Sequence, residues 1–126
     1  MKQYKLVKGY EALSRLASIK MPAACAYKIY KLIKTLDADY NYFVNGERDL
    51  LRKYNADIKP DGAITFKNKD NAIMFQKELD DIGNVEADVD FTVIQIPINV
   101  VEDQIMIPAD MMALDGFIEF CDQVVS

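Results

Sequence analysis

The most regular pattern of apolar and polar residues runs from Pro22 to Tyr54 and has the period of an α-helix. At 100° per residue, its apolar positions fall in one arc of about 100° and most charged positions in the opposite arc. The apolar stripe consists of Cys25, Ile29, Leu32, Ile33, Leu36, Tyr40, Phe43, Leu50, Leu51 and Tyr54. Only Glu47 interrupts it, and it keeps its phase across Gly46, although glycine costs about 1 kcal/mol against alanine inside a helix. The pattern predicts one long amphipathic helix with a weak point or kink at Gly46.

Shorter elements precede the long helix. Residues Gln3 to Val7 fit a brief strand that ends before Gly9, and the apolar spacing from Tyr10 to Ile19 fits a short helix. Pro22 suits the first turn of the long helix, because the N–H that proline lacks would have no helical partner there. The link between the two helices is short, so the pattern predicts an antiparallel helical hairpin.

A third helix is expected after a turn. Residues 59–62 read Lys-Pro-Asp-Gly, in which proline presets φ and glycine supplies a positive φ, and a brief strand is expected at 63–66. Asn68 or Asp70 can cap the helix that follows, and Gly83 is placed to end it. The apolar residues of this helix recur at spacings of three and four, and they are Ala72, Phe75, Leu79 and Ile82.

The remaining chain predicts strands and a last helical region. From Val85 to Val93 apolar residues alternate with polar ones, which is typical of a strand with one buried face. The phase changes after Val93, so a bulge or bend is expected there, and Pro97 places that end at a sheet edge. Residues 105–107 form another extended patch. Pro108 opens a helical region that reaches Phe120 and is divided at Gly116.

Together these elements predict one α+β domain that spans residues 1–126. The long helix forms a helical hairpin, packed with a third helix and a small, mostly antiparallel β-sheet, and a short C-terminal helical region follows. Helical and strand periodicities each place their apolar residues on one face, so these faces should share a core. The residues expected to be buried together are Leu32, Leu36, Phe43, Phe75, Leu79, Phe91 and Val93.

Composition adds few restrictions. The chain has 126 residues, of which 51% are hydrophobic and 28% charged, as in a globular protein with a real core. No apolar run reaches the ~20 residues of a membrane helix, and the N-terminus lacks the apolar segment of a signal peptide, so we expect a cytoplasmic protein without membrane contact. Cys25 and Cys121 are expected as reduced core thiols. The sequence has no histidine, which excludes histidine-dependent catalysis and zinc sites with histidine ligands.

Charge is distributed unevenly. Residues 1–53 hold eleven basic and five acidic side chains, residues 54–126 hold four and fifteen, and all seven tyrosines lie in the first 54 residues. Basic residues mixed with tyrosines on one helix face suit a phosphate-bearing ligand. The candidate ligand residues are Tyr27, Tyr30, Lys31, Lys34, Arg48 and Arg52. A solvated outer face explains the same pattern, and we favour that interpretation.

Other chemistry finds little support, and we expect no enzyme, no cofactor and no metal. Asp88 and Asp90 share a strand face and could face a hard cation, but no glycine-bearing calcium loop accompanies them. The sequence has no glycine-rich phosphate loop, and its hydroxyl side chains have no activating neighbour. Glu47 in the apolar stripe is expected either to pair with a base such as Arg15 or to have a raised pKa.

The order of several short motifs resembles a known family. The motifs are PAACAYKIYKLIK at 22–34, LLRKY at 50–54, DGAI at 61–64, FQKEL at 75–79, VEADV at 85–89 and MMALD at 111–115. In this order they resemble small uncharacterised phage and prophage proteins of Gram-positive bacteria, over about residues 7–120. Gly46 and the pair Ile107-Pro108 depart from that family. The resemblance implies a phage or prophage origin and a bacterial host cytoplasm, and it assigns no activity and no functional residue.

Two functional hypotheses remain. We favour a non-enzymatic factor for virion assembly or host takeover, whose acidic β region or methionine-rich C-terminal patch docks on a phage or host protein. The contact residues expected on that patch are Met111, Met112 and Phe117. The alternative is a nucleotide or nucleic-acid binder or scavenger that uses the Tyr/Lys/Arg face of the long helix. A net charge of −5 disfavours nucleic acid, but a small pocket stays open, including one between subunits of a homo-oligomer.

Overall fold

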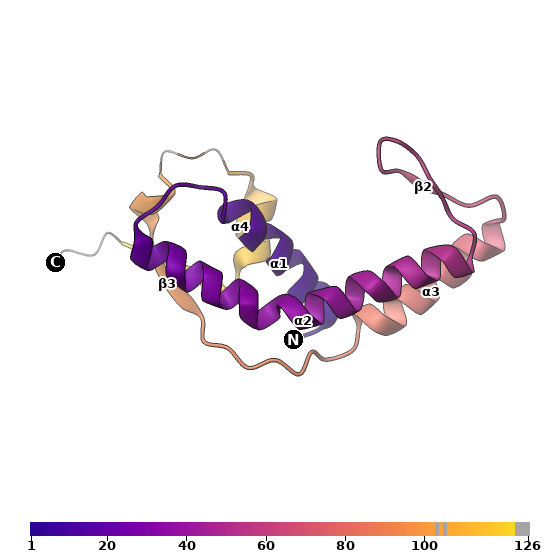
Figure 1. The fold of residues 1–126 in the computed structure, drawn as a ribbon, viewed down its shortest axis with the longest axis horizontal. Coiled ribbons are helices and arrows are strands. Elements are labelled where there is room, and N and C mark those ends of the chain that lie inside the picture. Colours follow the sequence, from indigo (N-terminus) through magenta and orange to yellow (C-terminus); the bar gives the residue numbers. More distant parts are fainter. Residues whose placement is uncertain (103, 105, 123–126) are drawn as a thin grey trace.

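A computed structural model describes residues 1–102, 104 and 106–122 and confirms the α+β class. One long helix runs along the molecule with shorter helices beside it, and the strands are few and short (Figure 1). No helix among the described residues is long and apolar enough to cross a membrane. The elements are α1 (Gln3–Leu16), α2 (Ala23–Lys53), β1 (Asp57–Ile58), β2 (Ile64–Thr65), α3 (Lys69–Gly83), β3 (Ile94–Pro97), the 3₁₀ turn η1 (Ile98–Val100), α4 (Pro108–Leu114) and β4 (Ile118–Cys121).

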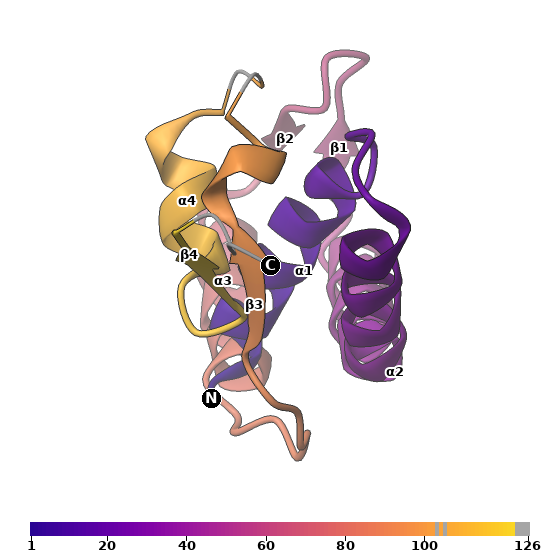
Figure 2. The same ribbon diagram turned by 90° about the vertical axis from the view of Figure 1, so that its left-hand side faces the viewer.

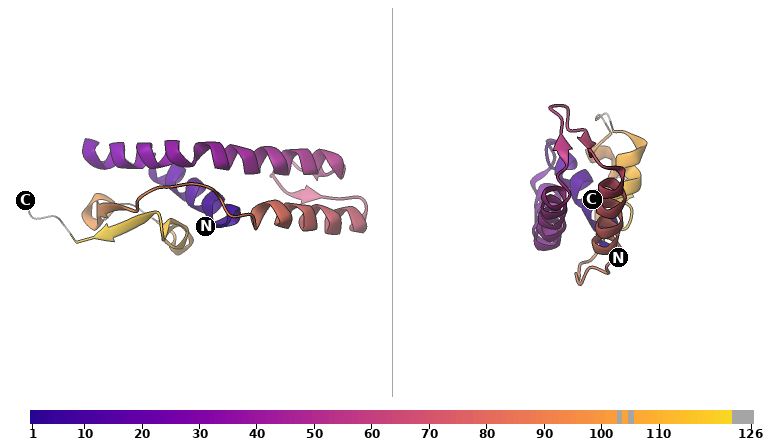
Figure 3. Two further views of the ribbon diagram at one scale, coloured as in Figure 1. Left: turned by 90° about the horizontal axis from the view of Figure 1, so that it is seen from below. Right: turned by 90° about the vertical axis from the view of Figure 1, so that its right-hand side faces the viewer.

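The long helix α2 confirms the sequence prediction to within one residue at each end. It continues through Gly46, whose φ is not positive, and Pro22 stands at its N-cap. The buried residues of α2 all belong to the predicted apolar stripe. They are Cys25, Ile29, Leu32, Leu36 and Phe43. α2 therefore forms one side of the molecule, and α1, α3 and the C-terminal elements lie on the other side (Figure 3).

The expected strand at residues 3–7 is wrong, because α1 is one helix from Gln3 to Leu16. Leu6 and Leu13 lie on the same face, seven residues apart, and both are fully buried. Gly9 does not end the helix. A side chain at Gly9 would collide with the ring of Phe117, so glycine allows α1 to approach the C-terminal segment closely.

The apolar side chains form two cores along α2. The large core joins α1 and the first half of α2 to β3, β4 and α4, and its buried residues are Leu6, Ala12, Leu13, Leu16, Cys25, Ile29, Leu32, Leu36, Ile96, Val101, Leu114, Phe117 and Ile118. The small core lies between α1, α2 and α3, and its buried residues are Val7, Phe43, Phe75 and Leu79. The predicted single core is thus divided. Phe91 is half-buried and stacks on Phe117, with ring centroids 5.4 Å apart, but Val93 is 42% exposed and its predicted burial is wrong.

The strand predicted at 85–93 is wrong over most of its length. Glu86 forms an isolated bridge with Lys2, and residues 87–93 run as an extended connector without a strand partner. The alternation of burial still holds, since Ala87, Val89 and Phe91 pack on the large core while the residues between them are exposed. Such alternation requires one buried face, but it does not require a hydrogen-bonded neighbour. The predicted change of phase is present, because Val93 is exposed and the register of β3 starts at Ile94.

The strands form two separate pairs. β1 and β2 form a short antiparallel hairpin that projects beyond α2 and α3, and Gly62 in its turn has a φ of +90°. β3 and β4 are parallel, with Ile94 opposite Ile118 and Pro97 opposite Cys121. Figure 2 shows this pair beside α4. β3 also contacts α2, where Lys28 donates to the backbone oxygen of Gln95.

The predicted C-terminal helical region is correct only as far as Leu114. Pro108 begins α4 as expected, but Gly116, with a φ of +87°, reverses the chain, and β4 follows. The helical prediction for residues 117–120 is therefore wrong. Phe117 donates its N–H to Leu114 and accepts from the N–H of Ile94, so this segment joins β3. Of the extended patch predicted at 105–107, Met106 and Ile107 are in no strand and Ile105 lies outside the described residues.

Candidate functional site

The predicted ligand face on α2 is exposed but is not a single site. Tyr27 is 61% exposed and carries Lys31 above its ring, with the Nζ atom 6.0 Å from the ring centroid. Both line a shallow hollow of about 260 Å³ against the connector at 90–92. Tyr30 lines a different hollow with Ile33, although it is only about 60° around the helix from Tyr27. Lys34 is exposed and lines neither hollow.

The two arginines of that prediction are remote from the tyrosines. Arg48 and Arg52 are both exposed near the far end of α2. At about 1.5 Å per residue, Arg48 is roughly 26 Å along the helix from Lys31, which exceeds the reach of a mononucleotide. The structure does not bring the six predicted ligand residues together.

The predicted protein-contact residues lie in α4 or just after it, and their side chains face two different hollows and the large core. Met112 is 77% exposed and Met111 is 36% exposed, so both side chains can contact a partner. Phe117 is fully buried, so its predicted role in contact is wrong, and it belongs to the large core instead. Because Met111 and Met112 are adjacent on a helix, they face two separate hollows, one on each side of α4.

Met112 faces a groove between α1 and α4, with a volume of about 700 Å³. One wall comes from Lys2 and from α1, where Lys5 and Lys8 follow at intervals of three residues. The opposite wall presents the apolar side chains of Ala109, Met112 and Ala113 of α4. Three carboxylates also line the groove, and they belong to Glu11, Asp110 and Asp115. All three lysines are exposed, and within the described part of the chain none forms an ion pair. The row of lysines therefore faces the apolar side chains of α4.

A polar contact lies near each end of this α1–α4 groove. At one end Arg15 donates two hydrogen bonds to Asp110, from Nη2 at 2.7 Å and from Nε at 3.1 Å, and the Asp110 carboxylate raises the pKa of Arg15. At the other end the hydroxyl of Tyr4 donates to Asp80 of α3. Burial and the Asp80 carboxylate raise the pKa of Tyr4 to about 12, so its hydroxyl stays protonated. The Arg15–Asp110 pair joins the two walls of the groove, and the Tyr4–Asp80 contact joins the α1 wall to α3.

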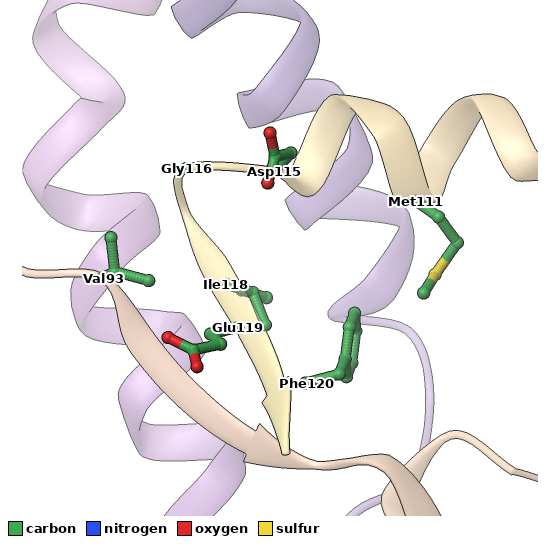
Figure 4. A pocket seen from close by; sticks show the side chains of 7 residues that line it. All are labelled: Val93, Met111, Asp115, Gly116, Ile118, Glu119 and Phe120. Atoms are coloured by element: carbon green, nitrogen blue, oxygen red, sulfur yellow. The ribbon is translucent and has the colours of Figure 1, made fainter.

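Met111 faces a second hollow of about 470 Å³ beside β4. Figure 4 shows Met111 and Phe120 on one side of the strand, and Val93 and Glu119 on the other side. Val93, Glu119 and Asp115 are exposed, and Phe120 is half-buried. The hollow thus combines apolar side chains with two carboxylates.

Residues suited to metal binding are not grouped in the described part of the chain. No set of three Cys, Asp or Glu residues there could hold a metal ion, and Asp88 and Asp90 are both exposed on the connector. The predicted partner of Glu47, Arg15, pairs with Asp110 instead. Burial and the nearby charge of Glu11 raise the pKa of Glu47, which was the other outcome considered. Cys25 is buried and Cys121 half-buried, and both are free thiols.

Sequence reasoning missed the lysine wall because it assigned residues 3–7 to a strand. In a strand, residues spaced by three point to opposite faces, whereas in a helix they lie along one side. A helical interpretation of residues 3–16 would have placed Lys2, Lys5 and Lys8 in one row.

Comparisons with models of protein families, with curated proteins and with solved structures gave no match for this chain. The α1–α4 groove and its chemistry are therefore the basis for a functional assignment.

Proposed function

We propose that this protein is a non-catalytic binding protein that holds an acidic helical segment of a partner protein in the α1–α4 groove. The observation that carries the proposal is the row Lys2, Lys5 and Lys8 opposite the apolar wall around Met112. Exposed methionine suits an adaptable contact, and a groove with one apolar wall suits an amphipathic helix. The lysines then select a helix whose adjacent edge is acidic.

The length of the groove limits its occupant. From Lys2 to Arg15 the chain advances by about 20 Å at 1.5 Å per residue, which matches a helical segment of about 13 residues. Arg15 is paired with Asp110, so its positive charge is not free to bind an acidic residue at that end of the groove. The acidic residues of the occupant should therefore lie near the Lys2 end, over Lys5 and Lys8.

A nucleotide ligand on α2 is supported by one observation, the pairing of Tyr27 with Lys31. The adjacent hollow measures about 260 Å³, which is smaller than most pockets for small molecules, and Asp90 lies in its lining. A carboxylate in the lining opposes the binding of a phosphate. We therefore rank nucleotide binding as the second hypothesis, after binding of a helical peptide.

The resemblance of the sequence to phage and prophage proteins supports the further proposal that the partner is a phage or bacterial host protein. We propose the bacterial host cytoplasm as the location on the same basis. These two statements depend on the resemblance and not on the groove.

The proposal is tested with two blocked, helix-forming peptides of about 14 residues. One carries glutamates along the edge next to its apolar stripe, and the other carries lysines at those positions. Fluorescence anisotropy should show saturable binding of the acidic peptide only. The double variant Lys5→Glu/Lys8→Glu should bind it at least about tenfold more weakly, since each tenfold change corresponds to about 1.4 kcal/mol. Met112→Glu should weaken binding in the same assay.

The matched control is Lys31→Glu/Lys34→Glu, which makes the same charge change on the outer face of α2. It should leave peptide binding unchanged. Equal loss in both double variants would show a response to net charge alone and would contradict the proposal. Calorimetry with linear and cyclic nucleotides decides the second hypothesis, because micromolar binding that is lost in Lys31→Ala/Lys34→Ala would replace the peptide proposal.

A further inference from the structure

The parallel pair β3–β4 has one covered edge and one open edge. On the outer side of β3, the backbone oxygen of Gln95 accepts a hydrogen bond from Lys28 of α2, with a distance of 3.5 Å. β4 lies at the margin of the molecule, on the side away from α2 (Figure 3). A two-stranded parallel sheet is unusually small, and an uncovered edge can accept a further strand.

The register identifies the backbone groups that the open edge presents. The N–H of Ile94 donates to the carbonyl of Phe117, with a distance of 3.1 Å, and Ile94 is opposite Ile118. In a parallel ladder the bonds on one edge come from alternate residues, so Glu119 points its backbone groups toward β3. Ile118 and Phe120 point theirs to the open edge. In the described part of the chain, no backbone hydrogen bond outside the ladder uses these groups.

We infer that the β4 edge takes up an extended peptide of a partner protein as a third strand, with alternating apolar and basic residues. One face of that strand would lie over the 470 Å³ hollow, where Met111 and Phe120 supply apolar contacts. The other face would lie beside Glu119, which is exposed, so a lysine or arginine fits there. Backbone hydrogen bonds give such a strand its affinity, and the side-chain contacts select its sequence.

A second copy of this chain is a poorer occupant of the same edge. If two β4 strands paired antiparallel about a twofold axis at Glu119, Ile118 would be opposite the partner's Phe120. Glu119 would then be directly opposite the same glutamate of the other copy. Like charges in that position destabilise a pair of strands. The charge at Glu119 therefore favours a basic peptide from another protein. The α1–α4 groove lies on the other side of α4 and shares only Asp115 with this hollow, and neither proposal depends on the other.

The test uses blocked peptides of sequence TVKVKVT and TVEVEVT, and the first peptide with N-methyl groups on successive backbone nitrogens. Titrations followed by NMR should show saturable shifts for TVKVKVT that are centred on residues 118–121. Amide hydrogen exchange at Ile118 and Phe120 should slow in the complex. The N-methylated peptide should bind at least about tenfold more weakly, since it cannot donate from either edge.

Two variants separate strand addition from a general response to charge. Glu119→Lys should reverse the preference, so that TVEVEVT binds and TVKVKVT does not. Asp88→Lys makes the same charge change on the exposed connector and should leave the preference unchanged. The inference is overturned if TVKVKVT causes no saturable shift, if N-methylation has no effect, or if both variants respond alike. The Lys5→Glu/Lys8→Glu variant should bind TVKVKVT as the parent does, so failure of the groove proposal is a distinct result.

Discussion

The two halves of α2 are packed in different ways. Among the described residues, thirteen buried side chains form the large core around its first half, and they come from α1, α2, α4, the turn at Phe117, the two parallel strands and the loop after η1. Four buried side chains of the described chain form the small core around its second half, and the β1–β2 hairpin projects from that end. Ile58 and Ile64 are opposite each other in the hairpin, and both are exposed.

This difference indicates where the molecule is most stable. The large core joins α1 to segments about a hundred residues later in the chain, so its loss amounts to global unfolding. The small core is formed mainly by α2 and α3, which are neighbours in sequence, and its few apolar contacts permit local opening. We expect the α3 and hairpin end to exchange its amide hydrogens first.

The largest effect is expected from Phe117→Ala. Phe117 is fully buried, stacks on Phe91 and fills the space that Gly9 leaves. Its removal should lower the free energy of unfolding by about 3–5 kcal/mol, as large aromatic deletions do. Phe75→Ala is the matched change in the small core and should cost about 3 kcal/mol or less, because that smaller site can collapse more easily. Urea melts of both variants measure the difference, and an equal or larger loss for Phe75→Ala contradicts the ranking of the two cores.

Leu36→Ala should cost about 2–5 kcal/mol, since Leu36 is fully buried in the large core. Leu79→Ala in the small core should fall at the lower end of that range. Hydrogen exchange should show a further difference: Leu79→Ala speeds exchange in α3 alone, while Leu36→Ala speeds it throughout. A loss of less than about 0.5 kcal/mol for Leu36→Ala would refute the helix register of α2.

The sequence predicted the elements that have their own periodicity. α2 and α3 carry regular apolar stripes, interrupted in α2 only by Glu47, and Asn68 caps α3 as expected by accepting from the N–H of Asp70. The secondary-structure predictions are wrong where tertiary packing determines the local conformation. Gly9 suggested a break but serves as the contact point for Phe117, and the apolar residues at 117–120 fit a helix until β3 is placed beside them. A parallel strand pair depends on a partner more than twenty residues away, which local periodicity does not reveal.

The candidate sites were predicted less completely than the fold. Met111 and Met112 were correctly expected at the surface, but the sequence did not show that α4 separates them. The lysine wall of the α1–α4 groove required the helical state of residues 3–7. The open edge of β4 required the register with β3, because the same residues in a helix present no free backbone edge.

Two tyrosine hydroxyls allow the contacts of α1 with α2 and with α3 to be compared at alkaline pH. Tyr10 donates to Asp37 at 2.7 Å and joins α1 to α2, and Tyr4 donates to Asp80 and joins α1 to α3. The hydrogen bond to Asp37 raises the pKa of Tyr10 to about 12, and burial together with Asp80 does the same for Tyr4. Because both pKa values are raised on folding, the stability they contribute is complete below pH 10 and is lost as the pH rises through about 12.

Tyr10→Phe and Tyr4→Phe should each flatten the fall in stability between pH 10 and 12. Only Tyr4→Phe should also speed hydrogen exchange in α3, because it breaks a contact of the small core's helix. Chemical denaturation across this pH range measures the slope. An unchanged slope in both variants would show that the two hydroxyls do not titrate with folding.

Gly46→Ala tests the part of α2 between its two halves. The backbone at Gly46 is helical, so alanine should stabilise the helix by up to about 1 kcal/mol. A methyl group there would come within 3.1 Å of the Cδ1 atom of Ile82, which must move slightly, and we expect a net gain of about 0.5 kcal/mol. A rise in the melting temperature, with slower exchange in the second half of α2, is the expected result. A lowered melting temperature would mean that Ile82 cannot move.

The smallest effect is expected from Lys31→Ala/Lys34→Ala on the outer face of α2. Both lysines are exposed, and among the described residues neither forms an ion pair, so they belong to neither core. Solvated charges contribute little to folding, and alanine is the better helix former, so the free energy of unfolding should change by no more than about 0.5 kcal/mol. Binding of the acidic helical peptide should also be unchanged, because the α1–α4 groove lies on the other side of α1. A loss of stability above about 1 kcal/mol would show that the outer face of α2 is packed in the native protein. α2 would then have a third packed surface in addition to the large core and the small core.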